Sequence, residues 1–176
     1  MDHSLLQNDA VVTIQNGFFN WLPTYNVAEK ERLMEECILK NITVSLRNEL
    51  VFVIGPVGAG KSSFANVCLG EMNKMSGDYA VKRTTVGYTS QNAWIINGTV
   101  KENVIFGRNV NQEWYNQVLK ATTLDTDIAL FELKDATPIG ERGVNLSGGQ
   151  KARLSLARAL YAQPDFYILD GMISSF

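Results

Sequence analysis

The sequence contains little of what several protein classes require. Only two of its 176 residues are cysteine and one is histidine, which disfavours a disulfide framework or a zinc site. No stretch approaches the roughly 18 consecutive apolar residues of a transmembrane helix, and the polar start, Met1–Ser4, is unlike a signal peptide. The 16 lysines and arginines do not exceed the 18 aspartates and glutamates, which disfavours nucleic-acid binding through bulk positive charge. With 45% hydrophobic residues, the chain is expected to form a soluble globular unit near the size of one domain.

Several apolar segments predict strands. Val11–Ile14 and Phe18–Phe19 are typical of strand material interrupted at Asn16–Gly17, and Ile42–Leu46 alternates like a half-buried strand. Two continuous apolar runs, Leu50–Ile54 and Phe166–Leu169, predict strands buried on both faces of a mostly parallel sheet.

Helical patterns lie between the two apolar runs. Residues 110–133 carry helical spacing, with Trp114, Val118 and Ala121 on one stripe. Thr99–Glu102 has the sequence of a capping box and predicts the start of a separate helix. Together with the strands, this order predicts an α/β layer that carries a helical insertion.

A glycine-rich loop follows the first apolar run. Gly55–Ser62 reads GPVGAGKS and matches G-x-x-x-x-G-K-[ST], and the helix-compatible Ser63–Val67 comes next. Glycines allow the backbone N–H groups to point at one anion, and the helix adds its positive N-terminal end. Lys61 would contact the β- and γ-phosphates and the Ser62 hydroxyl would bind Mg²⁺. We predict phosphate binding here.

A second pattern lies downstream. Leu146–Gln150 reads LSGGQ and precedes Lys151–Tyr161, whose apolar residues recur at helical spacing. A Ser-Gly-Gly entry to a helix creates another anion-binding N-terminus. Asp170 follows the second apolar run, where its carboxylate could hold Mg²⁺ opposite Ser62. The basic residues of this helix, which we interpret as a solvated or interdomain side, are Lys151, Arg153 and Arg158.

These motifs, in this order, resemble the nucleotide-binding domain of an ABC ATPase: Gly55–Ser62, Gln91, Leu146–Gln150 and Asp170. Two further stretches, Asn97–Gly107 and Ile139–Asn145, resemble the subfamily C exporters of the multidrug-resistance-associated type, most closely their first nucleotide-binding half. The resemblance implies an α/β P-loop NTPase fold with a mixed central sheet, an N-terminal antiparallel β part and a helical signature subdomain at about residues 92–160. An N-terminal tail, 1–10, would precede the ATP-binding domain, 11–176.

The resemblance also implies the site residues. ATP would be bound by Trp21, which stacks on adenine, and by Gly55, Gly58, Gly60, Lys61, Ser62, Ser63 and Gln91. Mg²⁺ would be held by Ser62, Gln91 and Asp170. The signature residues would cover the γ-phosphate held by a facing second domain, and they are Ser147, Gly148, Gly149 and Gln150. In the Q-loop, Ser90 replaces the usual proline, which could loosen the loop.

The match departs from the family at the catalytic position. Gly171 stands where a glutamate normally polarises the attacking water, and glycine has no group that could do so. The only histidine, His3, lies at the wrong end to be the switch histidine, and Ser174–Phe176 aligns with the start of the D-loop. We therefore expect a domain truncated within the D-loop that binds ATP with little or no independent hydrolysis.

The implied partners are a second ABC nucleotide-binding domain, paralogous or identical, and the transmembrane domains of a transporter, with no nucleic acid. The chain would power or gate an exporter, using ATP and Mg²⁺, at the cytoplasmic face of a membrane. The region around Trp94–Ile96 would join the surface that receives the membrane domains, or it is plain core. The alternative function is a non-hydrolysing, ATP-dependent regulatory module of a channel or transporter, which Gly171 favours.

Overall fold

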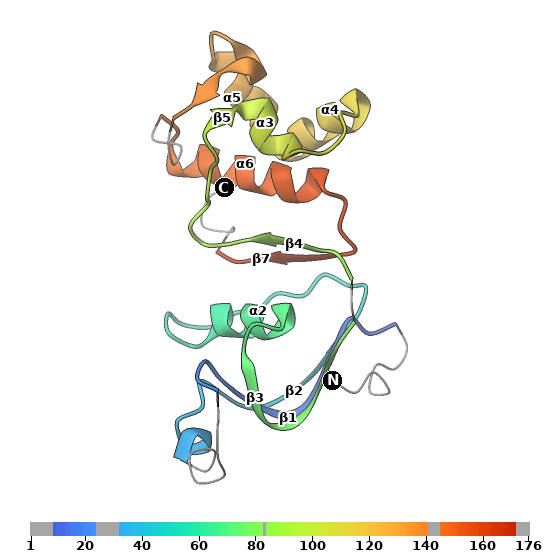
Figure 1. The fold of residues 1–176 in the computed structure, drawn as a ribbon, viewed down its shortest axis with the longest axis vertical. Helices are drawn as coiled ribbons and strands as arrows, with labels where there is room; N and C mark the ends of the chain where they lie inside the picture. Colours follow the sequence, from blue (N-terminus) through green and yellow to red (C-terminus); the bar gives the residue numbers. More distant parts are fainter. Residues whose placement is uncertain (1–8, 24–31, 83, 141–144, 172–176) are drawn as a thin grey trace. The chain divides into compact units, whose positions relative to one another are not determined.

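The computed structural model describes residues 9–23, 32–82, 84–140 and 145–171. The chain divides into two compact units, residues 1–83 and 84–176 (Figure 1). Three features discussed from the sequence lie outside the described residues: His3, residues 141–144 of the second exporter-like stretch, and Ser174–Phe176.

A three-stranded antiparallel sheet forms the base of the first unit. Its order is β2 (Leu39–Leu46), β1 (Val12–Asn20), β3 (Asn73–Val81). The predicted interruption at Asn16–Gly17 is an irregularity within the single strand β1, where the register shifts against both neighbours. Asn16 takes a left-handed φ of 48° there, as the extra residue of a bulge often does. The prediction of a half-buried β2 is confirmed.

Helix α2 (Lys61–Leu69) begins directly after the glycine-rich loop, as predicted. Its Val67 and Cys68 are buried, and the Tyr79 hydroxyl of β3 donates a hydrogen bond to the Val67 carbonyl. Tyr79 also packs edge-on against Phe19 of β1, with ring centroids 5.3 Å apart. These contacts attach the C-terminal half of α2 to the sheet.

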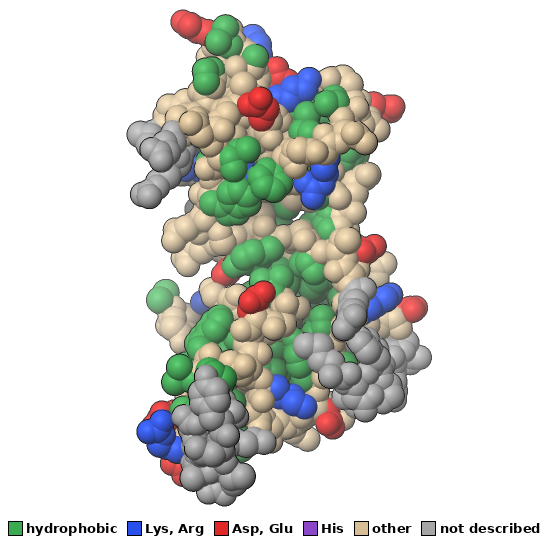
Figure 2. Space-filling view, viewed as in Figure 1, with side chains coloured by type: hydrophobic (Ala, Val, Ile, Leu, Met, Phe, Trp, Pro, Cys, Tyr) green, Lys and Arg blue, Asp and Glu red, His purple; other side chains and the backbone are tan. Residues whose placement is uncertain are grey.

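The apolar run Leu50–Ile54 differs from the prediction. It lies outside any described helix or strand, and its side chains are exposed, from 45% for Val51 to 89% for Ile54. The prediction of a doubly buried strand is wrong for this structure, because no described strand pairs with the run. Figure 2 shows hydrophobic side chains exposed in several patches on the face in view.

The second unit contains a parallel strand pair, β4 (Val86–Thr89) and β7 (Phe166–Leu169). The register joins Thr89 to Leu169, so both strands end at the same edge. The strand prediction for β7 is confirmed, but its burial is not: Ile168 is buried, whereas Tyr167 and Leu169 are 38% and 49% exposed. The structure thus combines helices with strands and contains the N-terminal antiparallel sheet, while the mixed central sheet stays a prediction.

The remaining elements of this unit surround a core of helices. In chain order they are β5 (Gly98–Thr99), α3 (Val100–Ile105), α4 (Gln112–Ala121), α5 (Leu124–Leu130), the 3₁₀ helix η2 (Lys134–Ala136), β6 (Pro138–Ile139) and α6 (Gly148–Tyr161). β5 and β6 pair antiparallel. Helix α6 supplies Leu154, Ala157 and Tyr161 to a buried cluster that residues of α3, α4 and α5 complete. α6 is therefore the helix around which the unit is packed.

Local sequence signals explain two of these helices. Thr99 and Glu102 form the predicted capping box, with hydrogen bonds of 2.7 and 3.1 Å that satisfy N–H groups at the start of α3. The predicted stripe on residues 110–133 is only partly correct. Val118 is buried, but Ala121 is exposed, and Tyr115 and Leu119 complete the buried face. None of the described helices is long and apolar enough to cross a membrane.

Candidate functional site

The glycine-rich loop ends at a helix whose first N–H groups receive no side-chain cap. Gly60 is the N-cap of α2, and both Gly58 and Gly60 take left-handed φ values, 82° and 88°. Successive N–H groups in such a conformation point into one concavity, which favours an anion. A side chain on residue 60 would be strained by the left-handed φ, and its Cβ would also approach Cδ2 of Leu39 to 2.9 Å, so glycine is favoured there. The loop therefore has the geometry of a phosphate cradle.

Lys61 lies folded over this loop. Its Nζ donates to the carbonyl oxygens of Gly55 and Pro56, at 3.0 and 2.8 Å. The ammonium thus already sits above the backbone that would surround a phosphate. Phosphate oxygens are stronger acceptors than carbonyls, so a bound nucleotide would compete for the same three donor hydrogens.

The other ATP-binding residues expected in the first unit are accessible. Ser62 is exposed and Ser63 half-buried in the first turn of α2. Trp21 is 46% exposed, and its backbone is held by Asn20 and Asn73 through hydrogen bonds of 2.8 and 2.9 Å. An accessible indole on a fixed backbone is suited to stacking on a base. Their role in binding ATP stays a prediction.

In the second unit, the structure brings Gln91, Asp170 and Gly171 together at the end of the β4–β7 pair. The Asp170 N–H donates to the Thr89 carbonyl at 2.9 Å, which continues the strand pairing. A Cβ on Gly171 would lie 2.9 Å from Cγ of Gln91. Gln91, the expected Q-loop glutamine, therefore lies against Gly171, where the resemblance would place a catalytic glutamate.

Oxygen donors at these positions fit a magnesium ion. Ser62 offers a hydroxyl, Gln91 an amide oxygen and Asp170 a carboxylate, and Mg²⁺ prefers hard oxygen ligands. Asp170 is half-buried and Gln91 exposed. Ser62 belongs to the first unit and the other two to the second, so their joint use of one ion stays a prediction.

The signature residues form the N-terminus of α6. Ser147 is the N-cap, its Oγ accepts from the Gln150 N–H at 3.3 Å, and the Gln150 amide oxygen accepts from the Ser147 N–H at 2.9 Å. Ser147 and Gly148 are exposed, and Gly149 and Gln150 half-buried. Because Ser147 Oγ only accepts in this box, its own hydrogen is left to donate outward. A 14-residue helix whose N-terminal end is exposed in this way is suited to an external anion.

One important residue was misjudged from the sequence. Arg158 is 7% exposed, although its spacing indicated a solvated or interdomain side. Its guanidinium donates to the Asn103 carbonyl at 2.8 Å, to Asn103 Oδ1 at 2.7 Å and to the Trp94 carbonyl at 3.0 Å. Burial lowers the pKa of Arg158 to about 10, which leaves the group charged at neutral pH.

The aromatic rings above Arg158 form an exposed pair. The guanidinium carbon lies 4.1 Å from the Trp94 ring centroid and 5.3 Å from that of Phe106. The two rings meet edge to face at 5.3 Å, and they are 49% and 42% exposed. We call Trp94 and Phe106 the aromatic pair. Ile95, next to Trp94 in the sequence, is buried in the core cluster. Neighbouring exposed aromatics over a rigid cation are typical of a protein interface.

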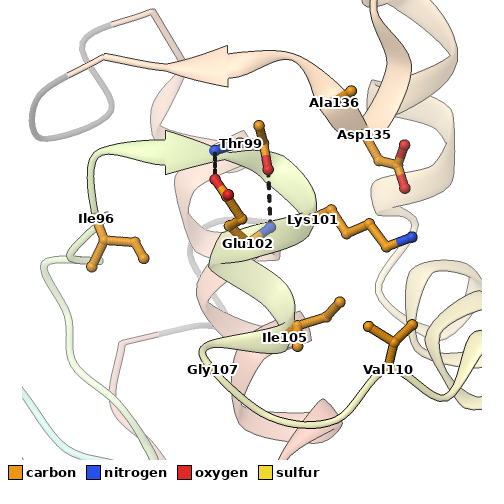
Figure 3. A pocket seen from close by; sticks show the side chains of 9 residues that line it. All are labelled: Ile96, Thr99, Lys101, Glu102, Ile105, Gly107, Val110, Asp135 and Ala136. Atoms are coloured by element: carbon orange, nitrogen blue, oxygen red, sulfur yellow. Dashed lines mark hydrogen bonds between the residues drawn. The ribbon is translucent and has the colours of Figure 1, made fainter.

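A hollow of about 620 Å³ lies elsewhere in the same unit, beside α3 (Figure 3). Ile96, Ile105 and Val110 provide apolar lining, and Lys101 and Asp135 add charges of opposite sign. Figure 3 also shows the capping box of Thr99 and Glu102 at its edge. None of the expected site residues lines this hollow, so it is separate from the nucleotide chemistry.

Comparisons with known proteins agree with these motifs. The ABC transporter family matches residues 39–174. ABC transporter C family member 12 of Dictyostelium discoideum is 44% identical over 166 residues, which are 93% of this chain and 12% of that protein. ATP-binding cassette sub-family C member 2 of Homo sapiens is 45% identical over 141 residues, 80% of this chain and 9% of that protein. Bile pigment transporter 1 of Saccharomyces cerevisiae is 41% identical, and the match covers 93% of this chain and 12% of that protein. The chain thus spans about a tenth of the length of these relatives.

Proposed function

Because the chain belongs to the ABC transporter family, as an ATP-binding domain similar to those of the C family, we propose that it closes around ATP with a second such domain and thereby powers or gates a transmembrane exporter. The observation that carries this proposal is the presence of two uncovered helix N-termini, at α2 and α6. One of these helix ends belongs to each unit. In the proposal, the end of α2 holds the nucleotide of this chain and the end of α6 covers the nucleotide of the facing domain.

The residues have distinct roles in this proposal. The loop Gly55–Ser63 binds the phosphates through backbone N–H groups and Lys61, and Trp21 stacks on the adenine. Mg²⁺, when bound by Ser62, Gln91 and Asp170, would neutralise charge on the phosphate oxygens. Ser147–Gln150 would donate to the γ-phosphate held by the facing domain, through the free hydroxyl hydrogen and the N–H groups that begin α6.

We further propose that the aromatic pair, Trp94 and Phe106, receives the transmembrane domains. These rings are large, half exposed and held from below by Arg158, so a partner could bury them at little entropic cost. Docking through this surface would locate the chain at the cytoplasmic face of a membrane.

A second function is favoured by Gly171: a regulatory module that binds ATP without hydrolysing it. The φ of Gly171 is +72°, and the space beside it is filled by the Gln91 side chain. Gly171 itself has no group that could deprotonate water in the place of the usual glutamate. ATP would then act by holding two domains together, and the partner's own site would perform any hydrolysis.

Titration of the chain with ATP by isothermal calorimetry tests the proposal. We expect saturable binding that Lys61→Ala weakens at least tenfold, since the variant loses a charge-assisted contact to phosphate. Lys82→Ala, which removes an exposed lysine of the same unit, serves as the matched control and should bind as the parent does. Equal affinities for the parent and Lys61→Ala would contradict the assigned phosphate site.

Sedimentation with saturating ATP then distinguishes a dimer from a simple ATP binder. We expect a dimer in ATP that ADP does not support and that Ser147→Phe abolishes, because the bulky ring would block the N-terminus of α6. Slow steady-state ATP hydrolysis by such a dimer would support the regulatory alternative. ATP hydrolysis as fast as that of a complete ABC pair would exclude it.

A further inference from the structure

Asp127 lies in the first turn of α5 and is almost fully buried, with 7% of its surface exposed. Its carboxylate accepts three hydrogen bonds, all from side chains of α6. Arg153 donates Nε to Oδ2 at 2.7 Å and Nη2 to Oδ1 at 2.9 Å, and Gln150 donates Nε2 to Oδ1 at 3.4 Å. This is the single ion pair found among the residues that the structure describes.

The contact with Gln150 decides which way that amide faces. A carboxylate can only accept hydrogen bonds, so the NH₂ end of Gln150 must face Asp127. The oxygen end is then directed to the Ser147 N–H, which it meets at 2.9 Å. With the amide reversed, the oxygen would meet the carboxylate and the capping box would lose one of its two bonds. Asp127 thus selects the orientation in which the box is complete.

Arg153 makes the same arrangement rigid. Its guanidinium meets the carboxylate through two parallel bonds, a geometry that fixes both planes. The hydrogen bond to Asp127 also raises the pKa of Arg153. Because Arg153 is one turn after Gln150, the pair prevents α6 from rotating relative to α5.

We propose that Asp127 is a positioning residue for the signature end of α6: it fixes Gln150 and Arg153, and through them the direction of the Ser147 hydroxyl and of the first N–H groups. The inference rests on the proposed function, in which those groups meet the γ-phosphate of a facing domain. Asp127 itself lies behind the site and touches no nucleotide. It also neutralises Arg153, so the positive charge at the signature end comes from the helix and not from a loose guanidinium.

The test compares Asp127→Ala, Asp127→Asn and Asp125→Ala in the full chain. Asp125 belongs to the same turn of α5 but bonds only to the neighbouring Thr126 N–H, at 3.0 Å, and is the matched control. Amide hydrogen exchange is measured for residues 148–153 and, as an internal reference, for α2. Sedimentation measures ATP-dependent association, and calorimetry measures ATP affinity, both well below the unfolding temperature of each variant.

We expect Asp127→Ala to accelerate exchange at residues 148–153 about tenfold, the scale of one lost charge-assisted hydrogen bond, while exchange in α2 is unchanged. ATP-dependent association should weaken about tenfold, with ATP affinity within twofold of the parent. Asp127→Asn keeps an acceptor for Gln150 and should recover part of both losses. Asp125→Ala should match the parent.

Parental exchange at residues 148–153 in Asp127→Ala would overturn the inference, as would faster exchange spread equally over α2, which indicates general destabilisation. If the parent chain does not associate in ATP, the dimer proposal fails, and amide exchange alone then decides the role of Asp127. If the parent associates and Ser147→Phe prevents it while Asp127→Ala does not, the dimer proposal stands and the inference about Asp127 is wrong.

Discussion

Replacing Arg158 should destabilise the second unit more than most single substitutions would. Arg158→Met keeps most of the side-chain volume but removes all three donors to Asn103 and Trp94. Asn103 Oδ1 still accepts from the Ile96 N–H at 3.0 Å, so the two backbone carbonyls lose most. Each buried acceptor left unpaired costs about 1–3 kcal/mol, and the lost cation–π contact costs about 1 kcal/mol. Relief from burying a charge offsets part of this sum, so we expect a loss of about 3–4 kcal/mol.

Arg158→Lys separates the charge from its geometry. Lysine keeps the positive charge over the aromatic pair but presents a single ammonium, which cannot reach three acceptors in the plane of a guanidinium. We expect a loss of about 2 kcal/mol, between the parent and Arg158→Met. The control is Arg108→Met, because Arg108 is exposed and surface substitutions stay within about 0.5 kcal/mol.

Urea unfolding followed by tryptophan fluorescence measures these free energies. A Trp21→Phe background leaves Trp94 and Trp114, the other two of the three tryptophans, which both belong to the second unit. The m-value must stay constant among variants for the comparison to hold. A loss below about 1 kcal/mol for Arg158→Met, or equal stability of Arg158→Lys and the parent, would refute the argument that the guanidinium fork carries this contact.

Two further predictions concern the catalytic position and the thiols. Gly171→Glu should fail to restore rapid ATP hydrolysis, and it should cost more stability than Gly107→Glu. Both glycines have left-handed φ values, 72° and 75°, but of the two only Gly171 has a neighbour, Gln91, in the path of a Cβ. The rate of ATP hydrolysis measures the first effect and thermal unfolding the second. Rapid ATP hydrolysis by Gly171→Glu would contradict the prediction, because it would show that Gln91 moves aside easily. Burial raises the pKa of Cys68 to about 12 and also raises that of Cys37, so both thiols stay protonated in the folded chain. Above about pH 8.5 the thiols of the unfolded chain ionise before those of the folded chain, so the free energy of unfolding should fall as the pH rises towards 12. Ellman's reagent should react with the thiols only when the chain unfolds. Rapid reaction of the folded chain would contradict their burial.

The conformation of the glycine-rich loop was predictable because its signals are local. Glycines at 58 and 60 adopt the left-handed conformation that their lack of a Cβ allows, and α2 contains the predicted helical residues Ser63–Val67 but begins two residues earlier, at Lys61. The capping box at Thr99 was equally predictable, since its two partners are three residues apart. Leu50–Ile54 shows the converse. An apolar run indicates burial only where a neighbouring strand supplies the partner, and no described strand pairs with it.

The buried side-chain hydrogen bonds of the second unit were not predictable from the sequence. Asp127 and Gln150 are 23 residues apart, and Arg158 and Asn103 are 55 residues apart. Neither pair has a spacing that a helical or strand period would reveal. Arg158 in particular follows the pattern of a surface residue. Its guanidinium supplies donors to the carbonyl of Asn103, in the short helix α3, and to that of Trp94, in a loop. A sequence pattern does not reveal which carbonyl groups need such donors.

The hydrogen bonds to Asp127 are needed because burial cannot fix the exposed start of α6, Ser147 and Gly148. A helix end that donates to an external anion must leave its first residues accessible, and Ser147 and Gly148 are exposed. Leu146, before the N-cap, is buried in the core cluster, and apolar packing resumes only at Ala152, after which Leu154 and Ala157 have no exposed surface. The turn before that point is held by hydrogen bonds to Asp127 instead, and these are directional where apolar contacts are not. A carboxylate behind the helix therefore achieves what a hydrophobic residue could not: it fixes the accessible end in one orientation and leaves its outer face free for a phosphate.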